Sequence, residues 1–271
     1  MFSDSPWFSF YQKREWNSIN FAMYYQNQNM PNSEWKSRTS LLLGEQGLES
    51  LHNARVLIAG LGGVGAQAAE HLCRAGVGHL TIVDGDFIHT TNRNRQLAAL
   101  VSTEGLAKTD VMSGRLLDIN PNLSLTIIQE YIKDERLIEV LDGNYDYVVD
   151  AIDTLGPKVH LLFNAVKLGI PIISSMCSGG KLDPRLVQVA DLNDSHSCRL
   201  AYYIRKRLHV MGIWKGIKVV FSPEAVSRLA VIITDDGLNK KSTVGTISYM
   251  PAVFGCFCAS VVIRDLVESR K

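Results

Sequence analysis

Four glycines and one aspartate in residues 55–86 have the types and the spacing to bind a phosphate and a ribose. Gly60 and Gly62 follow an apolar run; they allow positive φ and leave backbone N–H groups open to phosphate oxygens. Gly63 and Gly65 lie at the start of a predicted helix, whose free N–H groups and dipole favour an anion. Asp84 ends the next apolar run, 24 residues after Gly60, where a carboxylate can accept hydrogen bonds from ribose hydroxyls. The stretch predicts an adenosine-phosphate ligand but does not by itself separate NAD from ATP.

The residues that follow Asp84 could contact a triphosphate. Asp86 comes two positions later, and a polar loop of hydrogen-bond donors contains Asn92 and Arg95. An arginine suits a polyphosphate because its guanidinium binds two oxygens at once and never loses its charge. Lys108 opens a predicted amphipathic helix, although the helix dipole mildly disfavours a cation there, which hints at a purpose. Taken one at a time, such residues lie on a surface more often than in a site.

A second pair of acidic residues follows a predicted strand at 146–150. Asp150 and Asp153 lie at the carboxyl edge of the predicted parallel sheet, where ligands bind. One of the two could hold Mg²⁺ against phosphates. Capping of the next helix by Asp153 or Thr154 explains the same residues equally well, so both interpretations stay open.

A basic segment without acidic residues spans 195–218. Aromatic residues Tyr202, Tyr203 and Trp214 are interleaved with its cations, and such a segment can follow a phosphate backbone and stack bases. A solvated helix face with a few anchoring aromatics is the alternative. The basic residues, all weak candidates for RNA binding, are Arg199, Arg205, Lys206, Arg207, Lys215 and Lys218.

Alternating strands and helices position these residues. Across residues 55–176 the alternation predicts an α/β fold: a doubly wound, Rossmann-like, mostly parallel sheet with helices on both faces. Further strands and a final helix form a C-terminal α+β extension. The predicted strands are 56–59, 80–83, 125–128, 146–150, 172–175, 187–191 and 219–221, and the predicted helices are 66–74, 109–119, 136–141, 157–168 and 251–268.

The chain divides into an extension and one domain. Residues 1–32 show no helical or strand period and are expected to be poorly ordered; Met30 is a candidate start of the functional protein. Residues 33–271 are predicted to form a single domain. Its nucleotide-binding core is 55–176, and its remaining part, 177–271, faces the substrate or RNA and a dimer partner.

Two shorter segments complete the organisation. Residues 33–51 predict one or two short helices ahead of the first strand, and Arg38 within them would by default be a solvated arginine. Residues 234–243 are charged and contain glycine, which predicts a mobile loop.

Composition limits the class of protein and its compartment. A net charge of +1 over 271 residues excludes a globally basic nucleic-acid-binding protein. Five irregularly spaced cysteines without a C-x-x-C pair indicate a reducing cytoplasm and no structural zinc site of the four-cysteine type. Cys177, at a strand end, is the best candidate thiol and is interpreted as structural. No signal peptide is expected. Residues 244–263 are apolar enough for membrane association, but a buried or dimer-interface helix is preferred.

Together these motifs resemble the ThiF/E1-like family of ATP-dependent activating enzymes. The resemblance rests on G-x-G-G-x-G, D-G-D, N-x-N-R-Q, the lysine that follows and D-A-I-D-T, and it covers about residues 33–268. Within that family, SRTSLLLG, C-S-G-G-K-L-D-P and F-S-P-E look closest to the tRNA threonylcarbamoyladenosine dehydratases. The paired zinc cysteines that protein-modifying relatives often carry are absent from this sequence.

The resemblance implies roles for individual residues. The turn from Gly60 to Gly65 would hold the ATP phosphates, with Asp84 and Asp86 at the ribose side. Contacts to the triphosphate would come from Asn92, Arg95 and Lys108. Asp153 would bind Mg²⁺. Arg38 would reach across a homodimer into the partner's site, and Arg38, Arg95, Lys108 and Asp153 would carry most of the catalysis.

The implied reaction is ATP-dependent dehydration of threonylcarbamoyladenosine at position 37 of tRNA, through an adenylated carboxylate. The alternative within the family is adenylation of the C-terminal glycine of a ubiquitin-like sulfur-carrier protein, and a sulfur-donor or carrier protein is left open as a partner. An NAD-dependent oxidoreductase and a non-catalytic nucleotide-binding module are less consistent with the sequence. Arg95 together with Lys108 is more positive charge than a pyrophosphate needs.

Overall fold

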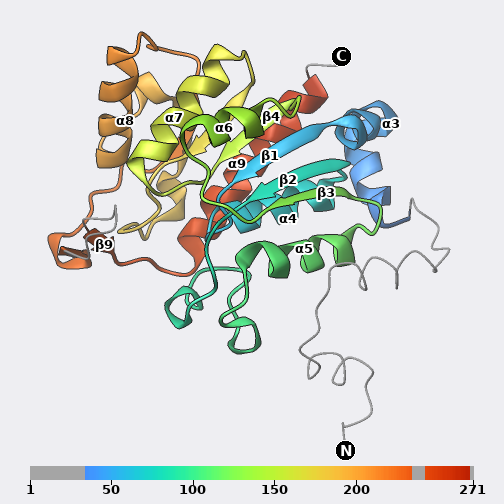
Figure 1. Ribbon diagram of the computed structural model, residues 1–271, viewed down its shortest axis with the longest axis horizontal. Coiled ribbons are helices and arrows are strands. Elements are labelled where there is room, and N and C mark those ends of the chain that lie inside the picture. Colours follow the sequence, from blue (N-terminus) through green and yellow to red (C-terminus); the bar gives the residue numbers. More distant parts are fainter. Residues whose placement is uncertain (1–33, 234–241, 269–271) are drawn as a thin grey trace, which may run out of the picture.

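Seven strands form one sheet at the centre of the computed structural model (Figure 1). The structure describes residues 34–233 and 242–268; the predicted N-terminal extension, Met30 and most of the predicted loop at 234–243 lie outside them. The strand order is β3-β2-β1-β4-β5-β7-β6, and within this sheet β6 alone runs antiparallel to its neighbour. The strands are β1 (Arg55–Ala59), β2 (His79–Val83), β3 (Ser124–Ile128), β4 (Tyr147–Asp150), β5 (Ile172–Ser175), β6 (Gln188–Asp191) and β7 (Lys218–Phe221).

The order of the strands changes direction between β1 and β4, which are neighbours. From β1 the chain builds outward through β2 and β3, and from β4 it builds the other way through β5. These five strands are parallel, so their carboxyl ends meet at one edge of the sheet. Ligands of doubly wound sheets bind at this edge, where the order reverses. The prediction of a doubly wound, mostly parallel sheet is confirmed.

Helices cover both faces of the sheet (Figure 1). Val56 and Ile58 belong to the core on one face, whereas Leu57 and Ala59 belong to the core on the other, because successive strand side chains point to opposite faces. The helices on the first face are α4 (Gly65–Ala75), α5 (Lys108–Ile119) and α9 (Tyr249–Glu268), and those on the second are α6 (Asp134–Leu141), α7 (Leu155–Lys167) and α8 (Arg199–Val210). Short 3-10 helices are Glu34–Lys36, Thr90–Asn92, Val101–Thr103, Pro184–Leu186, Leu192–Asp194 and Arg228–Ala230.

The predicted C-terminal extension continues the main sheet. Strand β7 pairs in parallel with β5, and β6 pairs with β7 at the sheet edge. A separate two-stranded sheet consists of β8 (Val231–Ile233) and β9 (Ser242–Val244). The predicted loop therefore ends earlier than position 243, because Ser242 and Thr243 pair with Ile233 and Ile232.

Helix α3 (Ser37–Asn53) precedes β1 and is broken at Gly44, which has φ 72° and ψ 170°. This agrees with the prediction of one or two short helices at 33–51. Its second half packs on α9, where a Cβ atom added at Gly47 would lie 3.5 Å from Val267.

Helix α9 is long enough and apolar enough to cross a membrane, judged by length and composition alone. It is about half buried in this fold, and it packs closely on α4: a Cβ atom added at Gly255 would lie 2.6 Å from the Cβ atom of Gln67. A core helix passes the same test of length and hydropathy, so α9 by itself is weak support for membrane association.

Candidate active site

The glycine turn joins β1 to α4 at the carboxyl edge of the sheet. Gly60 has φ +93°, and its N–H donates to the carbonyl of Val83 at 2.8 Å. A Cβ atom added at Gly65 would overlap the carbonyl oxygen of Gly60, and one added at Gly63 would lie 2.8 Å from Pro251. Gly62 differs, because the nearest atom to an added Cβ is the Gln96 Nε2 atom at 3.9 Å. Packing thus requires three of the glycines, while Gly62 leaves the backbone open to a ligand.

Asp84 stabilises this turn directly. One carboxylate oxygen accepts from the N–H of Leu61 at 2.6 Å, and the other accepts from the N–H of Asp86 at 2.8 Å. Burial raises the pKa of Asp84, while the nearby Lys108 ammonium and the two N–H donors act in the opposite direction. Two backbone N–H groups therefore fix the orientation of the Asp84 carboxylate, the predicted partner of the ribose hydroxyls.

Lys108, Asp86 and Tyr131 form one network beside Asp84. The Lys108 side chain is 5% exposed, and its Nζ atom lies 2.6 Å from Asp86 Oδ2 and 4.0 Å from Asp84 Oδ2. The Tyr131 hydroxyl donates to Asp86 Oδ1, which raises the pKa of Tyr131 to about 12. Tyr131 was not identified from the sequence. Its position shortly after the end of the parallel strand β3 could have indicated that it lies near the site.

The polar loop of Asn92 and Arg95 lies against the glycine turn. A Cβ atom added at Gly63 would lie 3.2 Å from the Arg95 carbonyl oxygen. Asn92 is buried, and its side-chain oxygen accepts from the N–H of His89 at 3.0 Å. The Arg95 guanidinium donates to the Thr91 carbonyl at 3.0 Å and to the side chain of Asn94 at 2.8 Å. Asn92 thus shapes the loop, and Arg95 supplies a cation beside the phosphate turn.

The two aspartates at the end of β4 differ in their surroundings, Asp150 being its last residue and Asp153 following it. Asp150 is fully buried and bonded to the Lys158 ammonium at 2.8 Å and to the Ser174 hydroxyl at 2.6 Å, so its carboxylate is already occupied. Asp153 is exposed, and its charge contributes to raising the pKa values of Tyr131 and Cys177. Asp153 therefore lies at the same edge as the rest of the site. Thr154, the residue before α7, makes no side-chain capping bond, which disfavours the capping interpretation for Thr154.

One exposed carboxylate at this edge, that of Asp153, is a candidate ligand for a divalent metal. Among the described residues, no group of three His, Cys, Asp or Glu side chains could hold a metal. Mg²⁺ bound to a nucleotide needs only one or two carboxylates, because the phosphates and water supply the other oxygens. An exposed Asp153 fits that donor set.

Arg38 lies away from the site of its own chain. It is exposed near the start of α3, and the side chain of nearby Lys36 lies against Gly76, 3.2 Å from the position of an added Cβ. Gly76 ends α4, whereas the glycine turn begins it. The eleven residues of α4 separate these ends by about 16 Å, so Arg38 is not brought to the other site residues within the chain.

The basic segment divides into outward and inward residues. Arg199, Lys206, Arg207 and Lys215 are exposed, as is Trp214 at 62%. The Arg205 guanidinium instead donates to the carbonyls of Leu192 and Ser195 at 3.1 and 2.8 Å. Lys218 is exposed, but its Nζ atom is paired with Asp265 at 2.6 Å.

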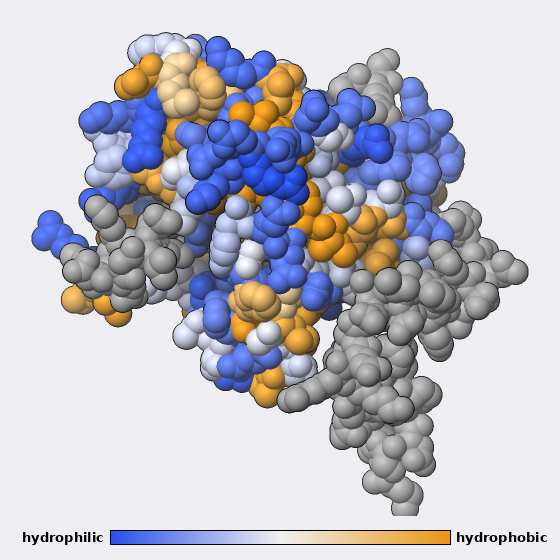
Figure 2. Space-filling view, in the orientation of Figure 1, coloured by the Kyte–Doolittle hydropathy of each residue, from blue (hydrophilic) through white to orange (hydrophobic). Residues whose placement is uncertain are grey.

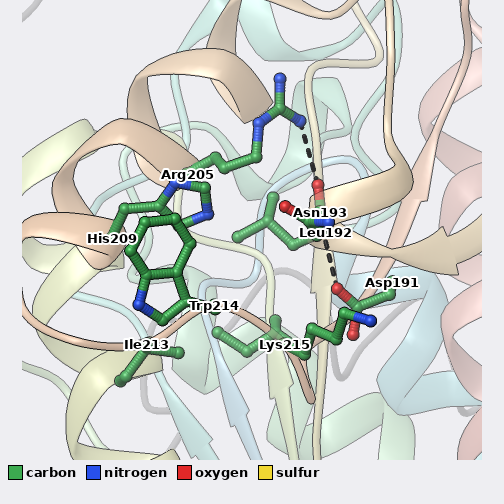
Figure 3. A pocket seen from close by; sticks show the side chains of 9 residues that line it. Asp191, Leu192, Asn193, Arg205, His209, Ile213, Trp214 and Lys215 are labelled. Carbon is green, nitrogen blue, oxygen red and sulfur yellow. Dashed lines mark hydrogen bonds between the residues drawn. The ribbon is translucent and has the colours of Figure 1, made fainter.

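Figure 3 shows the pocket beside Arg205, where the Trp214 ring stacks on His209 with 4.1 Å between centroids. Its volume of about 10 Å³ has room for about one water molecule. This pocket is therefore too small for an organic ligand.

The charges on α6 are mutually paired. In Figure 2 the surface over α6 is hydrophilic, and Arg136 there bonds Glu130 and Glu139 at 2.9 and 3.0 Å. With Asp134, Glu135 and Glu139 against one arginine, α6 is net acidic and is a poor surface for a polyanion.

The candidate thiol is not activated. Burial raises the pKa of Cys177, and its Sγ atom lies 3.8 Å from the carbonyl of Gly179. All five cysteines are free.

Known proteins resemble this chain over most of its length. The ThiF family model matches residues 36–270. A tRNA threonylcarbamoyladenosine dehydratase of Bacillus subtilis is 39% identical over 239 residues, which cover 86% of this chain and 94% of that protein. The crystal structure of the Escherichia coli enzyme of that name, in complex with ATP, superposes with a TM-score of 0.79 at 32% identity and covers 89% of this chain and 98% of its own. The sulfur carrier protein ThiS adenylyltransferase of Escherichia coli is 35% identical, over 64% of this chain and 74% of its own.

Proposed function

Because this chain belongs to the ThiF family, we propose that it uses ATP to dehydrate threonylcarbamoyladenosine in tRNA. The observation that carries the proposal is similarity to dehydratases of that name along nearly the full length of both proteins. The cluster of the glycine turn, Asp84, Lys108, Arg95 and Asp153 at one sheet edge supports ATP as the activating reagent.

The first step of the proposed reaction joins the substrate carboxylate to AMP. A carboxylate oxygen attacks the α-phosphorus, and the bond to the β-phosphate breaks to release pyrophosphate. Arg95 and Lys108 neutralise negative charge that develops on the phosphates, and Asp84 holds the ribose through hydrogen bonds. Asp153 would hold Mg²⁺, which would supply further positive charge to the triphosphate.

The second step closes a ring within the modified adenosine. An internal nucleophile of the threonylcarbamoyl group attacks the activated carbonyl and displaces AMP, which carries away the former carboxylate oxygen. The net change in the nucleoside is the loss of one water. No enzyme thiol is needed, in agreement with the raised pKa of Cys177.

A homodimer is part of the proposal. Arg38 lies on the far side of its own α4, so it can act on a triphosphate only in another subunit. Leu41 and Leu42, close to Arg38, are 88% and 83% exposed. Exposed apolar side chains of this size mark a surface that another protein covers, and a second copy would bring Arg38 with it.

The tRNA would contact the outward face of α8. Its exposed cations, without an acidic residue between them, suit a phosphate backbone. Tyr202 and, just beyond α8, Trp214 are 51% and 62% exposed; His209 covers one face of the Trp214 ring, and the exposed aromatic surface suits base stacking. The His196 ring lies 5.4 Å from that of Phe221, at the carboxyl end of β7, so the segment before α8 lies at the same edge of the sheet as the proposed ATP site.

Mass spectrometry of digested tRNA tests the proposed function. Protein, ATP and Mg²⁺ are incubated with threonylcarbamoyl-modified tRNA, and the modified adenosine is expected to lose the mass of one water. Asp153→Ala should abolish this loss, whereas Asp142→Ala, at the exposed end of α6, should leave it unchanged. An unchanged nucleoside with folded, ATP-binding protein would reject the proposed substrate.

The alternative is adenylation of a ubiquitin-like sulfur-carrier protein, which similarity to the ThiS adenylyltransferase supports. ATP–pyrophosphate exchange stimulated by such a carrier and not by modified tRNA would favour it, and would also make a sulfur-transfer partner part of the function.

A further inference from the structure

A fully buried ion pair lies beneath the turn between β4 and α7. Lys158 and Asp150 are both 0% exposed, and Lys158 Nζ lies 2.8 Å from Asp150 Oδ2. The same carboxylate oxygen accepts from the Ser174 hydroxyl of β5 at 2.6 Å. Lys158 is in the first turn and a half of α7, and it can reach back to this turn because helical side chains point toward the helix N-terminus.

The pair binds both backbone groups of Ile152. Asp150 Oδ1 accepts from the N–H of Ile152 at 3.1 Å, and Lys158 Nζ donates to its carbonyl at 2.8 Å. Asp153 is the next residue along the chain. Two bonds to opposite sides of one residue leave little freedom to the backbone that carries Asp153.

The same turn contacts the phosphate-binding turn. A Cβ atom added at Gly60 would lie 2.8 Å from the carbonyl oxygen of Ala151, and one added at Gly65 would lie 3.1 Å from the Ala151 side chain. The segment from Ala151 to Asp153 is therefore held from one side by the ion pair and from the other by the glycine turn.

Stability alone is a weak reason for this arrangement. A buried ion pair loses as much by desolvation as it gains by attraction, and an uncharged pair of similar volume is often as stable. Lys158 also lies near a helix N-terminus, where the dipole disfavours a cation. The geometry, by contrast, has a direct consequence for the neighbouring site.

We propose that Lys158 and Asp150 are positioning residues, which hold the Ile152 backbone so that the Asp153 carboxylate faces the phosphates bound at the glycine turn. The inference rests on the ATP-dependent function proposed above. Under this proposal Lys158 affects the binding of the nucleotide with Mg²⁺, although the side chains of Lys158 and Asp150 are fully buried and do not touch the nucleotide.

The test measures binding of a non-hydrolysable ATP analogue with and without Mg²⁺ by calorimetry. The double variant Asp150→Asn/Lys158→Met removes both charges and the bond to the Ile152 carbonyl while nearly keeping the volume, so it should remain folded. We expect its Mg²⁺-free affinity to stay within about twofold of wild type, because the glycine turn and Asp84 are intact. The tightening by Mg²⁺ should fall about tenfold, as in Asp153→Ala.

Lys158→Met alone leaves the buried Asp150 carboxylate without its cation and is expected to lose stability. The double variant keeps the proposal testable if that single variant does not fold. Arg115→Met is the matched control, because it breaks a partly exposed ion pair with Glu70, between α5 and α4, and it should leave the tightening by Mg²⁺ unchanged.

Three results would overturn the proposal. An unchanged tightening by Mg²⁺ in the folded double variant would reject a positioning role, and an equal loss of affinity with and without Mg²⁺ would show a general structural role instead. If the wild-type protein binds the analogue without any effect of Mg²⁺, the role of Asp153 in the proposed function fails first, and this inference fails with it.

Discussion

At the scale of single residues, the four glycines of the β1–α4 turn meet different physical demands. Gly60 has a positive φ, and Gly65 must allow the carbonyl of Gly60 to approach its Cα atom. Gly63 makes room for Pro251 of α9. Of these four glycines, Gly62 alone has open space for an added Cβ atom, so packing does not require a glycine there, and we predict that its missing side chain serves a ligand.

Alanine at two of these positions should therefore have opposite consequences. Gly65→Ala forces a backbone overlap and is expected to destabilise the fold by about 3 kcal/mol or more. Gly62→Ala has space for its methyl group and should change the free energy of unfolding by less than about 0.5 kcal/mol. Its Cβ atom would occupy the phosphate approach, so ATP affinity should fall about tenfold or more. Urea denaturation and calorimetric titration with ATP measure the two effects; a Gly62→Ala variant with normal affinity would contradict the assigned phosphate site.

At the scale of elements, α8 presents two faces with different roles. Its inward face is apolar, with Ala201, Ile204 and Leu208 buried. Arg205 donates hydrogen bonds to the carbonyls of Leu192 and Ser195 and so links α8 to the segment before it. Its outward face carries Lys206 and Arg207. Helical periodicity places Arg205 on the side of Ala201 and Leu208, and Arg207 away from it, so the six basic residues of 195–218 are not equivalent candidates.

Glutamine at these two arginines distinguishes the roles. Arg205→Gln removes charged hydrogen bonds to backbone carbonyls and should lower the free energy of unfolding by about 1–3 kcal/mol, with unchanged affinity for tRNA. Arg207→Gln should leave stability unchanged, weaken tRNA binding roughly fivefold at low salt and reduce the slope of log affinity against log salt by about one. Filter binding over a salt series reports both quantities. Equal tRNA affinities of the two variants would exclude α8 as the contact surface, without affecting the proposed reaction.

At the scale of the whole molecule, the position of α3 determines whether Arg38 can reach the site of its own chain. The sheet and its helices bring Asp84, Lys108, Arg95 and Asp153 to one edge, while Arg38 lies at the other end of α4, beside two leucines that this chain leaves exposed. A site that needs Arg38 is therefore incomplete in a single chain. Two-fold assembly would complete two sites at once.

Mixing two inactive variants tests this arrangement. Arg38→Ala and Asp153→Ala homodimers should each be inactive in the tRNA assay. In a heterodimer, the Arg38→Ala chain keeps Asp153 and would receive Arg38 from its partner, so one of the two sites is intact. Random exchange should then restore about a quarter of wild-type activity. If Arg38 acted within its own chain, the mixture would stay inactive.

The sequence alone determined the features that are local along the chain. The strand, glycine turn and helix of residues 55–75, Asp84 at the next strand end and the alternation that produces a parallel sheet all follow from short-range periodicity and backbone requirements. These features predict that the glycine turn and Asp84 meet at one edge of the sheet, as the structure has it, because parallel strands align their carboxyl ends. The loop prediction failed at Ser242 and Thr243, where pairing with β8 makes these residues part of a strand.

Tertiary structure decided which of several similar residues is buried and which is exposed. Asp150 and Asp153 differ because Lys158 and Ser174 bury the first carboxylate and leave the second exposed. Arg205 and Arg207 differ because carbonyls of a preceding segment bind the first. Tyr131 reaches Asp86 from 45 positions away, and Asn94 donates to the carbonyl of Thr246 from 152 positions away. Such partners meet only when the sheet has formed, and burial and hydrogen bonding then determine which charges remain free to act on a ligand.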